Sequence, residues 1–192
     1  MTSRNLEALE FLLTRRSQPY LTLAEPVPDT EQLMTLLTAA ARSPDHGMLE
    51  PWRFIVIEKS AMARLGNILR RRGAELGKAP SLVEKAAQVF DNANLVVAVI
   101  ASPNEEAKIP AIEQTLSAGA VCLSLLNAAL ASGWGATWLT GFGAHDEDFR
   151  RQALGIEPPE YVAGFIHIGT RRVVPSDRPR PNVNDLVSRL TN

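Results

Sequence analysis

Two arginines and a serine stand next to one another near the start of the chain, at Arg15, Arg16 and Ser17. Guanidinium groups and a hydroxyl can grip a phosphate through forked, charge-assisted hydrogen bonds. The triplet follows leucines at helical spacing, which places the arginines at the C-terminal end of a predicted helix. Cations at that place also interact with the helix dipole, an effect of about 0.3 to 1 kcal/mol. The triplet alone is compatible with both roles.

A second chemically capable cluster is the segment Pro-Asp-His-Gly-Met-Leu-Glu-Pro-Trp at positions 44–52. Pro44 restricts the backbone of the residue before it, and Gly47 permits a tight turn. The segment is therefore predicted to form a shaped loop that joins the end of a helix to a strand. His46 and Glu50 could reach a ligand from this loop, although a turn histidine packed against the preceding helix is the plainer interpretation.

Two later segments also carry polar groups. The stretch Gly-Ala-Thr-Trp-Leu-Thr-Gly at 135–141 is a glycine-bounded strand, and Arg178 and Arg180 lie in a proline-rich tail. Glycines at strand ends commonly mark turns, and arginines in a tail are mostly solvated charges. Each segment by itself is weak evidence for a binding site. It becomes informative only because it follows the first two clusters in the sequence.

Several other kinds of site find no support. The chain lacks the glycine-rich dinucleotide motif, the phosphate-binding P-loop and the His-Glu-x-x-His zinc motif, and no serine lies in a nucleophile elbow. Cys122 is the single cysteine, so no disulfide or thiolate zinc cluster is possible within the chain, and its apolar surroundings predict a small buried hydrophobe. No metal site and no catalytic side chain are expected.

Hydrophobic spacing predicts the elements that must position these residues. Helices are expected where apolar residues recur every three or four positions, over 6–15, 29–43, 60–72, 81–90, 110–132 and 147–154. Asp29 and Gln32 have the spacing of a capping box. Strands are expected where β-branched and aromatic residues concentrate, over 53–58, 94–102, 135–140 and 161–170. The tail from 178 to 185 should be extended, with a short helix after it.

Two of these elements are almost wholly apolar. The valine-rich run 94–102 predicts a central strand covered on both faces. The helix at 110–132 becomes apolar all round after Glu113 and Gln114, so we expect it to be buried on every side, in the core or at a subunit interface.

Composition sets further limits. The chain has 192 residues, 45% of them hydrophobic, which predicts one domain spanning residues 1–192. Its 20 lysines and arginines balance 21 aspartates and glutamates, so no nucleic-acid partner is expected. Glu7 and Glu10 are unlike a secretory signal, and no apolar run reaches the roughly 18 residues of a membrane span. A cytoplasmic protein without a membrane partner is the expectation.

From about Leu6 to Val187, the four clusters together resemble the flavin-binding pattern of the nitroreductase family, most closely its short, minimal members. The resemblance implies an α+β fold with a mostly antiparallel sheet flanked by helices. It also implies a homodimer with shared active sites, with FMN as cofactor and NAD(P)H as co-substrate. FAD is disfavoured because no dinucleotide fingerprint is present.

The resemblance also assigns roles to residues that match the family's motifs. Arg15 and Ser17, with Arg16 between them, would contact the flavin, and at least one of Arg178 and Arg180 would bind its phosphate. His46 and Glu50 would reach the flavin held by the neighbouring subunit. The strand that carries residues Trp138, Leu139 and Thr140 would lie along the flavin ring.

Two positions depart from the family pattern. Many relatives carry a lysine or arginine two residues beyond the serine, near flavin N1 and O2, and this chain has Pro19 there. Position 50 is more usually glutamine or asparagine, and a glutamate can accept hydrogen bonds but cannot donate to a phosphate. Both departures bear on the flavin potential and on activity.

The activity that the resemblance implies is a ping-pong oxidoreduction. NAD(P)H would reduce FMN and leave, and a small flat acceptor such as a nitroaromatic or a quinone would take its place; the cofactor carries the chemistry. Two alternatives stay open: a flavin-dependent reductase of another electron-poor substrate, and a flavin-binding module with little turnover.

Overall fold

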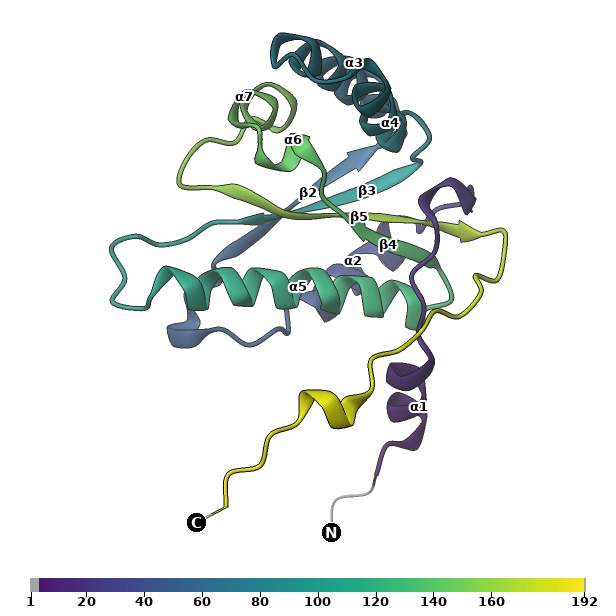
Figure 1. Ribbon diagram of the computed structural model, residues 1–192, viewed down its shortest axis with the longest axis vertical. Coiled ribbons are helices and arrows are strands. Elements are labelled where there is room, and N and C mark those ends of the chain that lie inside the picture. Colours follow the sequence, from purple (N-terminus) through teal and green to yellow (C-terminus); the bar gives the residue numbers. More distant parts are fainter. Residues whose placement is uncertain (1–3, 192) are drawn as a thin grey trace.

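The computed structural model describes residues 4–191, which are organised around a five-stranded sheet (Figure 1). The strands pair in the order β1-β5-β3-β2, and β4 pairs with the other edge of β5. Every pairing is antiparallel, which confirms the predicted α+β class. The strand bounds are β1 Leu23–Ala24, β2 Trp52–Glu58, β3 Leu95–Ala101, β4 Gly135–Leu139 and β5 Tyr161–Arg171.

Strand β3 lies at the centre of the sheet, as its valine-rich sequence predicted. All of its residues are buried, and its alternate side chains enter two different hydrophobic clusters because strand side chains point to opposite faces. Val96, Ala98 and Ile100 belong to the cluster on one face. Leu95, Val97 and Val99 belong to the cluster on the other.

Helices cover both faces of the sheet and so make three layers (Figure 1). One layer contains α3 Lys59–Glu75, α4 Pro80–Asp91, α6 Phe142–His145 and α7 Glu147–Phe149. The helices α3 and α4 approach closely, because Gly73 leaves the space that the Val83 side chain fills. The other layer contains α2 Thr30–Ala40, which begins with the predicted Asp29–Gln32 capping box, and α5 Ala111–Ala131.

Within one chain, the long helix α5 is buried on one side only. Burial of its other side at a subunit interface stays a prediction. Cys122 and Leu125 face the sheet and are fully buried, and burial raises the pKa of the Cys122 thiol to about 12. On the other side, Ile112 is 62% exposed and Leu116 is 65% exposed. In length and composition α5 also matches a membrane-spanning helix, but its packing against the sheet is that of a core helix.

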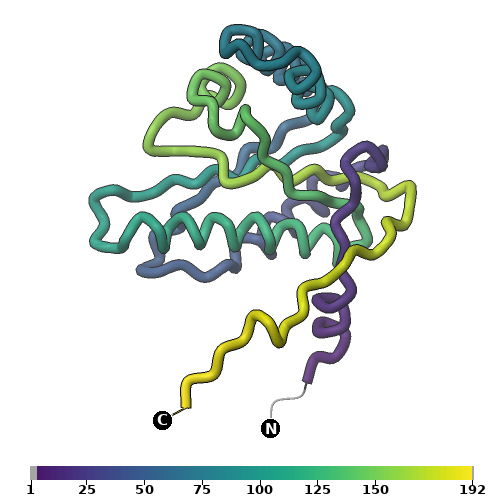
Figure 2. Tube along the Cα trace, viewed as in Figure 1, coloured from purple at the N-terminus to yellow at the C-terminus, as the bar shows by residue number. Residues whose placement is uncertain are grey.

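Helix α1 Leu6–Thr14 and the segment after β5 leave the body of the molecule from the same corner (Figures 1 and 2). Asn5 caps α1, and its Oδ1 accepts a hydrogen bond from the Ala8 N–H. No residue of α1 is buried. An isolated helix of this length is only marginally stable in water. We therefore expect another surface to cover the exposed leucines of α1.

The sequence missed or misplaced several short elements. The strand β1 and the one-turn helix α6 were not predicted. The helix expected over 147–154 is broken into α7 and a π-helical turn, Arg150–Leu154. The tail is extended as expected, but its short helix is a single turn at Val183–Leu186, earlier than predicted.

His167, in the middle of β5, is 1% exposed, and burial lowers its pKa to about 4. The unfolded chain therefore binds a proton that the folded chain excludes between about pH 6.5 and 4, so stability falls as the pH falls through that window. We expect the wild type to lose about 2 kcal/mol more than His167→Leu between pH 7 and pH 5. Urea unfolding at both pH values measures this, and equal losses in the two proteins would contradict it.

Candidate functional site

Three of the predicted arginines converge on a cavity of about 500 Å³ at the C-terminal end of α5. We call it the arginine cavity. Arg15 and Arg16 reach it from the end of α1, and Arg180 reaches it from the tail. Its other lining residues include Phe11, Gln18, Leu130, Arg171 and Asp177.

Arg15 has a buried nitrogen without a partner in the arginine cavity. Its Nη2 donates to Ser17 Oγ at 2.9 Å, but its buried Nε has no hydrogen-bond partner among the described residues. Burial lowers the pKa of Arg15, and the charges of Arg180 and Arg16 lower it further. A half-buried cation with two like charges nearby is stabilised by a bound anion, so this cavity fits a phosphate.

Hydrogen bonds tie the tail to the end of α1, and one of the two tail arginines lines the arginine cavity. Arg16 donates from Nε and Nη2 to the Ser176 carbonyl at 3.2 and 3.1 Å. Arg180 Nη2 donates to Asp177 Oδ1 at 3.0 Å. Of the two candidates, Arg180 lines the arginine cavity and Arg178 does not.

Gln18 was not predicted as a site residue. It is 3% exposed and lines the arginine cavity, and its Oε1 has no hydrogen-bond partner among residues 4–191. Its backbone N–H donates to the Ala136 carbonyl at 2.9 Å, which joins the triplet to β4. Its adjacency to Ser17 was the only signal in the sequence.

Strand β4 leads from the arginine cavity to the predicted ring contacts. Gly135, at its start, packs against Leu23 and Gln18 with no room for a Cβ. Trp138, near its end, lies across β5 at Gly164, where a Cβ would collide with the indole ring. Gly141 has a φ of +88° and turns the chain into α6.

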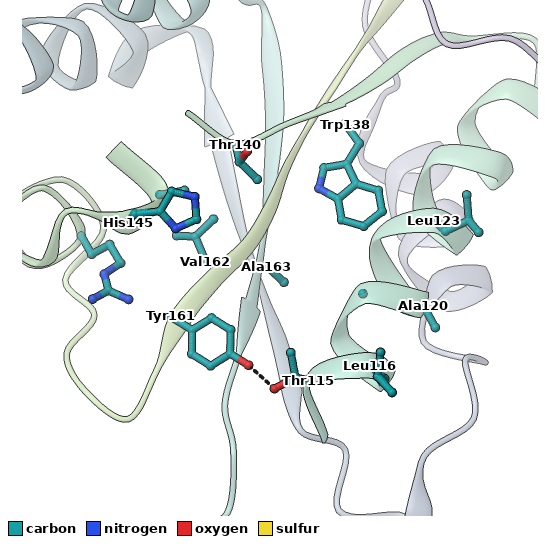
Figure 3. A pocket seen from close by; sticks show the side chains of 13 residues that line it. Thr115, Leu116, Ala120, Leu123, Trp138, Thr140, His145, Tyr161, Val162 and Ala163 are labelled. Atoms are coloured by element: carbon teal, nitrogen blue, oxygen red, sulfur yellow. Dashed lines mark hydrogen bonds between the residues drawn. The ribbon is translucent and has the colours of Figure 1, made fainter. Parts of the chain in front are cut away.

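Trp138 and Thr140 border two further cavities. The first, of about 740 Å³, lies against the exposed side of α5, and we call it the α5 cavity (Figure 3). The second, of about 430 Å³, lies against α4, and we call it the α4 cavity. Leu139 lines only the α4 cavity, with Tyr20, Lys85 and Phe142. A planar ligand at the end of β4 would have space on both sides.

The loop that carries His46 and Glu50 lies at the opposite end of α5. His46 Nδ1 is 2.8 Å from Oε2 of Glu113, in the first turn of that helix. The 21 residues of α5 span about 30 Å, so within one chain this loop cannot share a site with Arg15. The structure thus brings together the triplet, β4 and Arg180, and leaves His46 and Glu50 apart.

The loop around His46 has a strained backbone. Met48 and Glu50 have φ values of 52° and 48°, which residues other than glycine seldom adopt. The Asp45 carboxylate accepts the Glu50 N–H at 2.9 Å and holds that conformation. Strain held in this way clusters at ligand sites, which favours a binding role for the loop.

Comparisons with known proteins agree with this geometry. The model of the nitroreductase family matches residues 12–170. The chain is 35% identical over 165 residues to "Putative NAD(P)H nitroreductase YdjA" of Escherichia coli K12, covering 86% of this chain and 88% of that protein. It is 35% identical over 166 residues to "Putative NAD(P)H nitroreductase" of Haemophilus influenzae, covering 86% and 89%.

Solved structures show the same fold. A nitroreductase-like family protein from Bacillus cereus superimposes with a TM-score of 0.78 at 19% identity, covering 99% of this chain and 98% of that one. A protein from Desulfovibrio desulfuricans, described as a putative nitroreductase in complex with FMN, superimposes with a TM-score of 0.73 at 21% identity over 100% of both chains.

Proposed function

Because this chain belongs to the nitroreductase family, we propose that it is an FMN-dependent oxidoreductase that passes electrons from NAD(P)H to nitroaromatic or quinone-like acceptors. The observation that carries the proposal is the arginine cavity, where a buried guanidinium nitrogen of Arg15 has no hydrogen-bond partner in the described part of the chain and two further arginines lie nearby. A phosphate supplies the missing acceptor oxygens and the opposite charge.

The residues around the arginine cavity fit FMN in a definite order. Arg15 and Arg180 would hold the phosphate, with Ser17 and Gln18 beside it. The strand β4 would run along the cofactor, with Trp138, Leu139 and Thr140 at its ring. The resemblance placed Arg16 in the same set, and its bonds to Ser176 make it a residue that holds the tail in place.

When bound, FMN supplies the redox chemistry, taking two electrons from NAD(P)H and giving them to the acceptor after the nicotinamide has left. The protein binds and orients its ligands. Trp138 and Thr140 separate the α5 cavity from the α4 cavity and so define where a planar ligand can lie. The walls of both cavities are mostly apolar. No side chain is required as a general acid.

We further propose that the protein works as a homodimer with shared sites. A second copy packed across the exposed side of α5 would bring the His46 loop of one chain to the arginine cavity of the other. The arrangement is isologous, as in most homodimers. It also provides a surface for groups that a single chain leaves exposed, Ile112 on α5 and the leucines of α1.

Steady-state kinetics test the proposed activity. Purified protein should be yellow and should release FMN on denaturation. NAD(P)H oxidation should require both FMN and an acceptor, and double-reciprocal plots at several acceptor concentrations should be parallel. Colourless protein that does not bind added FMN would overturn the proposal.

The departure at Pro19 suggests a lowered flavin potential. Pro19 is exposed and has a φ of −59°, which any residue can adopt. We expect Pro19→Lys to raise the midpoint potential of the bound flavin, because a cation stabilises the reduced anionic form. Redox titration against a reference dye measures this. An unchanged potential with flavin still bound would show that another group already supplies the charge.

A cytoplasmic location is proposed from the composition of the chain.

A flavin-binding module with little turnover is the second candidate function, because Pro19 and Glu50 depart from the family pattern. A protein that binds FMN tightly, but whose flavin NAD(P)H does not reduce, would favour that candidate.

A further inference from the structure

The α5 cavity is lined by a second arginine with a buried nitrogen that has no hydrogen-bond partner among the described residues. Arg150, at the start of the π-helical turn, lines this cavity. Its Nε is buried without a hydrogen-bond partner, and it forms no ion pair with any described carboxylate. A guanidinium nitrogen that is buried without a hydrogen-bond acceptor is costly, so its presence at a cavity wall points to an anionic ligand.

The carboxylates nearest in sequence accept their hydrogen bonds from other arginines, and Arg150 acts on Asp146 through its charge alone. The Asp146 carboxylate accepts hydrogen bonds from Nε and Nη2 of Arg72 at 2.9 and 3.0 Å. These hydrogen bonds are the main cause of the lowered pKa of Asp146. Asp148 is paired with Arg72 at 2.9 Å and with Arg151. These contacts also tie the segment to α3, so Arg150 projects from a fixed backbone whose N–H donates to the Asp146 carbonyl at 3.0 Å.

The rest of the α5 cavity suits a flat aromatic body. Leu116, Leu123 and Trp138 form an apolar wall, and His145 and Tyr161 lie across from it (Figure 3). The Tyr161 hydroxyl is paired with Thr115 Oγ1 at 2.6 Å. A volume of about 740 Å³ is typical of a small-molecule site.

We propose that the acceptor is a flat aromatic or quinoid compound with an anionic substituent, such as a carboxylate, and that Arg150 binds this substituent. The proposal rests on the proposed function, because Trp138 and Thr140 connect this cavity to the proposed flavin site. A forked guanidinium matches a carboxylate with two parallel hydrogen bonds. His145, exposed at the same wall, adds a second donor.

A binding experiment tests the proposal without turnover. Benzoate and benzamide, which differ in charge but not in shape, are titrated into oxidised, FMN-loaded protein while the flavin absorbance is followed. We expect the wild type to prefer benzoate at least about tenfold, as a charge-assisted bond allows. Arg150→Gln should lose that preference. Arg151→Gln, which removes an exposed neighbouring charge paired with Asp148, should keep it.

Kinetics with para-nitrobenzoate and para-nitrobenzamide provide the second measurement. The ratio of the two kcat/KM values should fall about tenfold or more in Arg150→Gln and stay at the wild-type value in Arg151→Gln. Reduction of the flavin by NADH and NADPH is measured separately. If Arg150→Gln weakens NADPH binding and leaves the acceptor ratio unchanged, Arg150 binds the nucleotide phosphate and the proposal is wrong.

Other results are equally decisive. If Arg150→Gln weakens the dimer in sedimentation and leaves the benzoate preference unchanged, the guanidinium pairs with the second subunit and the proposal is overturned. If the protein binds no FMN, the proposed function fails, while benzoate can still be titrated into the apoprotein and followed by the ¹⁵N signal of the arginine side chains. A benzoate-specific shift that Arg150→Gln abolishes would then still support the anion site.

Discussion

Replacement of Arg15 by alanine is expected to weaken FMN binding at least about tenfold, because a desolvated charge-assisted hydrogen bond contributes about 1.5 to 3 kcal/mol. Arg15 carries the cavity's buried, unpartnered nitrogen. Without phosphate, loss of the side chain should even relieve the repulsion with Arg180 and Arg16 that lowers its pKa. We therefore expect apo Arg15→Ala to be at least as stable as the apo wild type.

Fluorescence titration of apoprotein with FMN measures the Kd, and thermal unfolding with and without FMN measures the stability. Arg42→Ala is a matched control, because Arg42 is an exposed arginine outside the arginine cavity. An Arg15→Ala variant with the wild-type Kd for FMN would exclude the arginine cavity as the phosphate site.

The second large effect is expected from mixed dimers. Arg15→Ala and His46→Ala should each be defective alone, since every site of each homodimer carries one defect. After co-refolding of equal amounts, each heterodimer has one site with both defects and one site with neither. Random pairing should then restore about a quarter of the wild-type flavin sites.

The chain offers a control for this experiment. Arg15 and Arg180 line the arginine cavity of the same chain, so a mixture of Arg15→Ala with Arg180→Ala leaves one defect in every site and should restore nothing. Recovery in both mixtures, or in neither despite proven heterodimers, would refute the shared-site proposal.

The parts of the fold that depend on local pattern were predictable. The capping box at Asp29 and Gln32 and the buried strand β3 are encoded in neighbouring residues, and both are confirmed. The strand β1 was missed because its two residues are defined only by pairing with β5, as in Leu23 with Arg171. Such long-range pairing leaves no periodic signal in a two-residue segment.

The site was predictable where its residues are adjacent in sequence. The sequence could not distinguish Arg178 from Arg180, because residues two apart in an extended segment point the same way. The path of the tail brings Arg180, and not Arg178, to the arginine cavity. Gln18 and Arg150 were not predicted, because each is distinguished only by a buried side-chain atom without a hydrogen-bond partner. That property depends on packing between distant elements and is invisible in a single sequence.

Anaerobic absorption spectroscopy of the purified protein tests the central proposal most directly. NAD(P)H is added to the FMN-loaded protein without oxygen, and excess nicotinamide is removed before a nitroaromatic or a quinone is added. We expect the flavin absorbance to bleach in the first step and to return in the second, with one acceptor reduced per flavin for a two-electron quinone. A bound flavin that NAD(P)H leaves oxidised, or that stays bleached with every acceptor tried, would contradict an oxidoreductase.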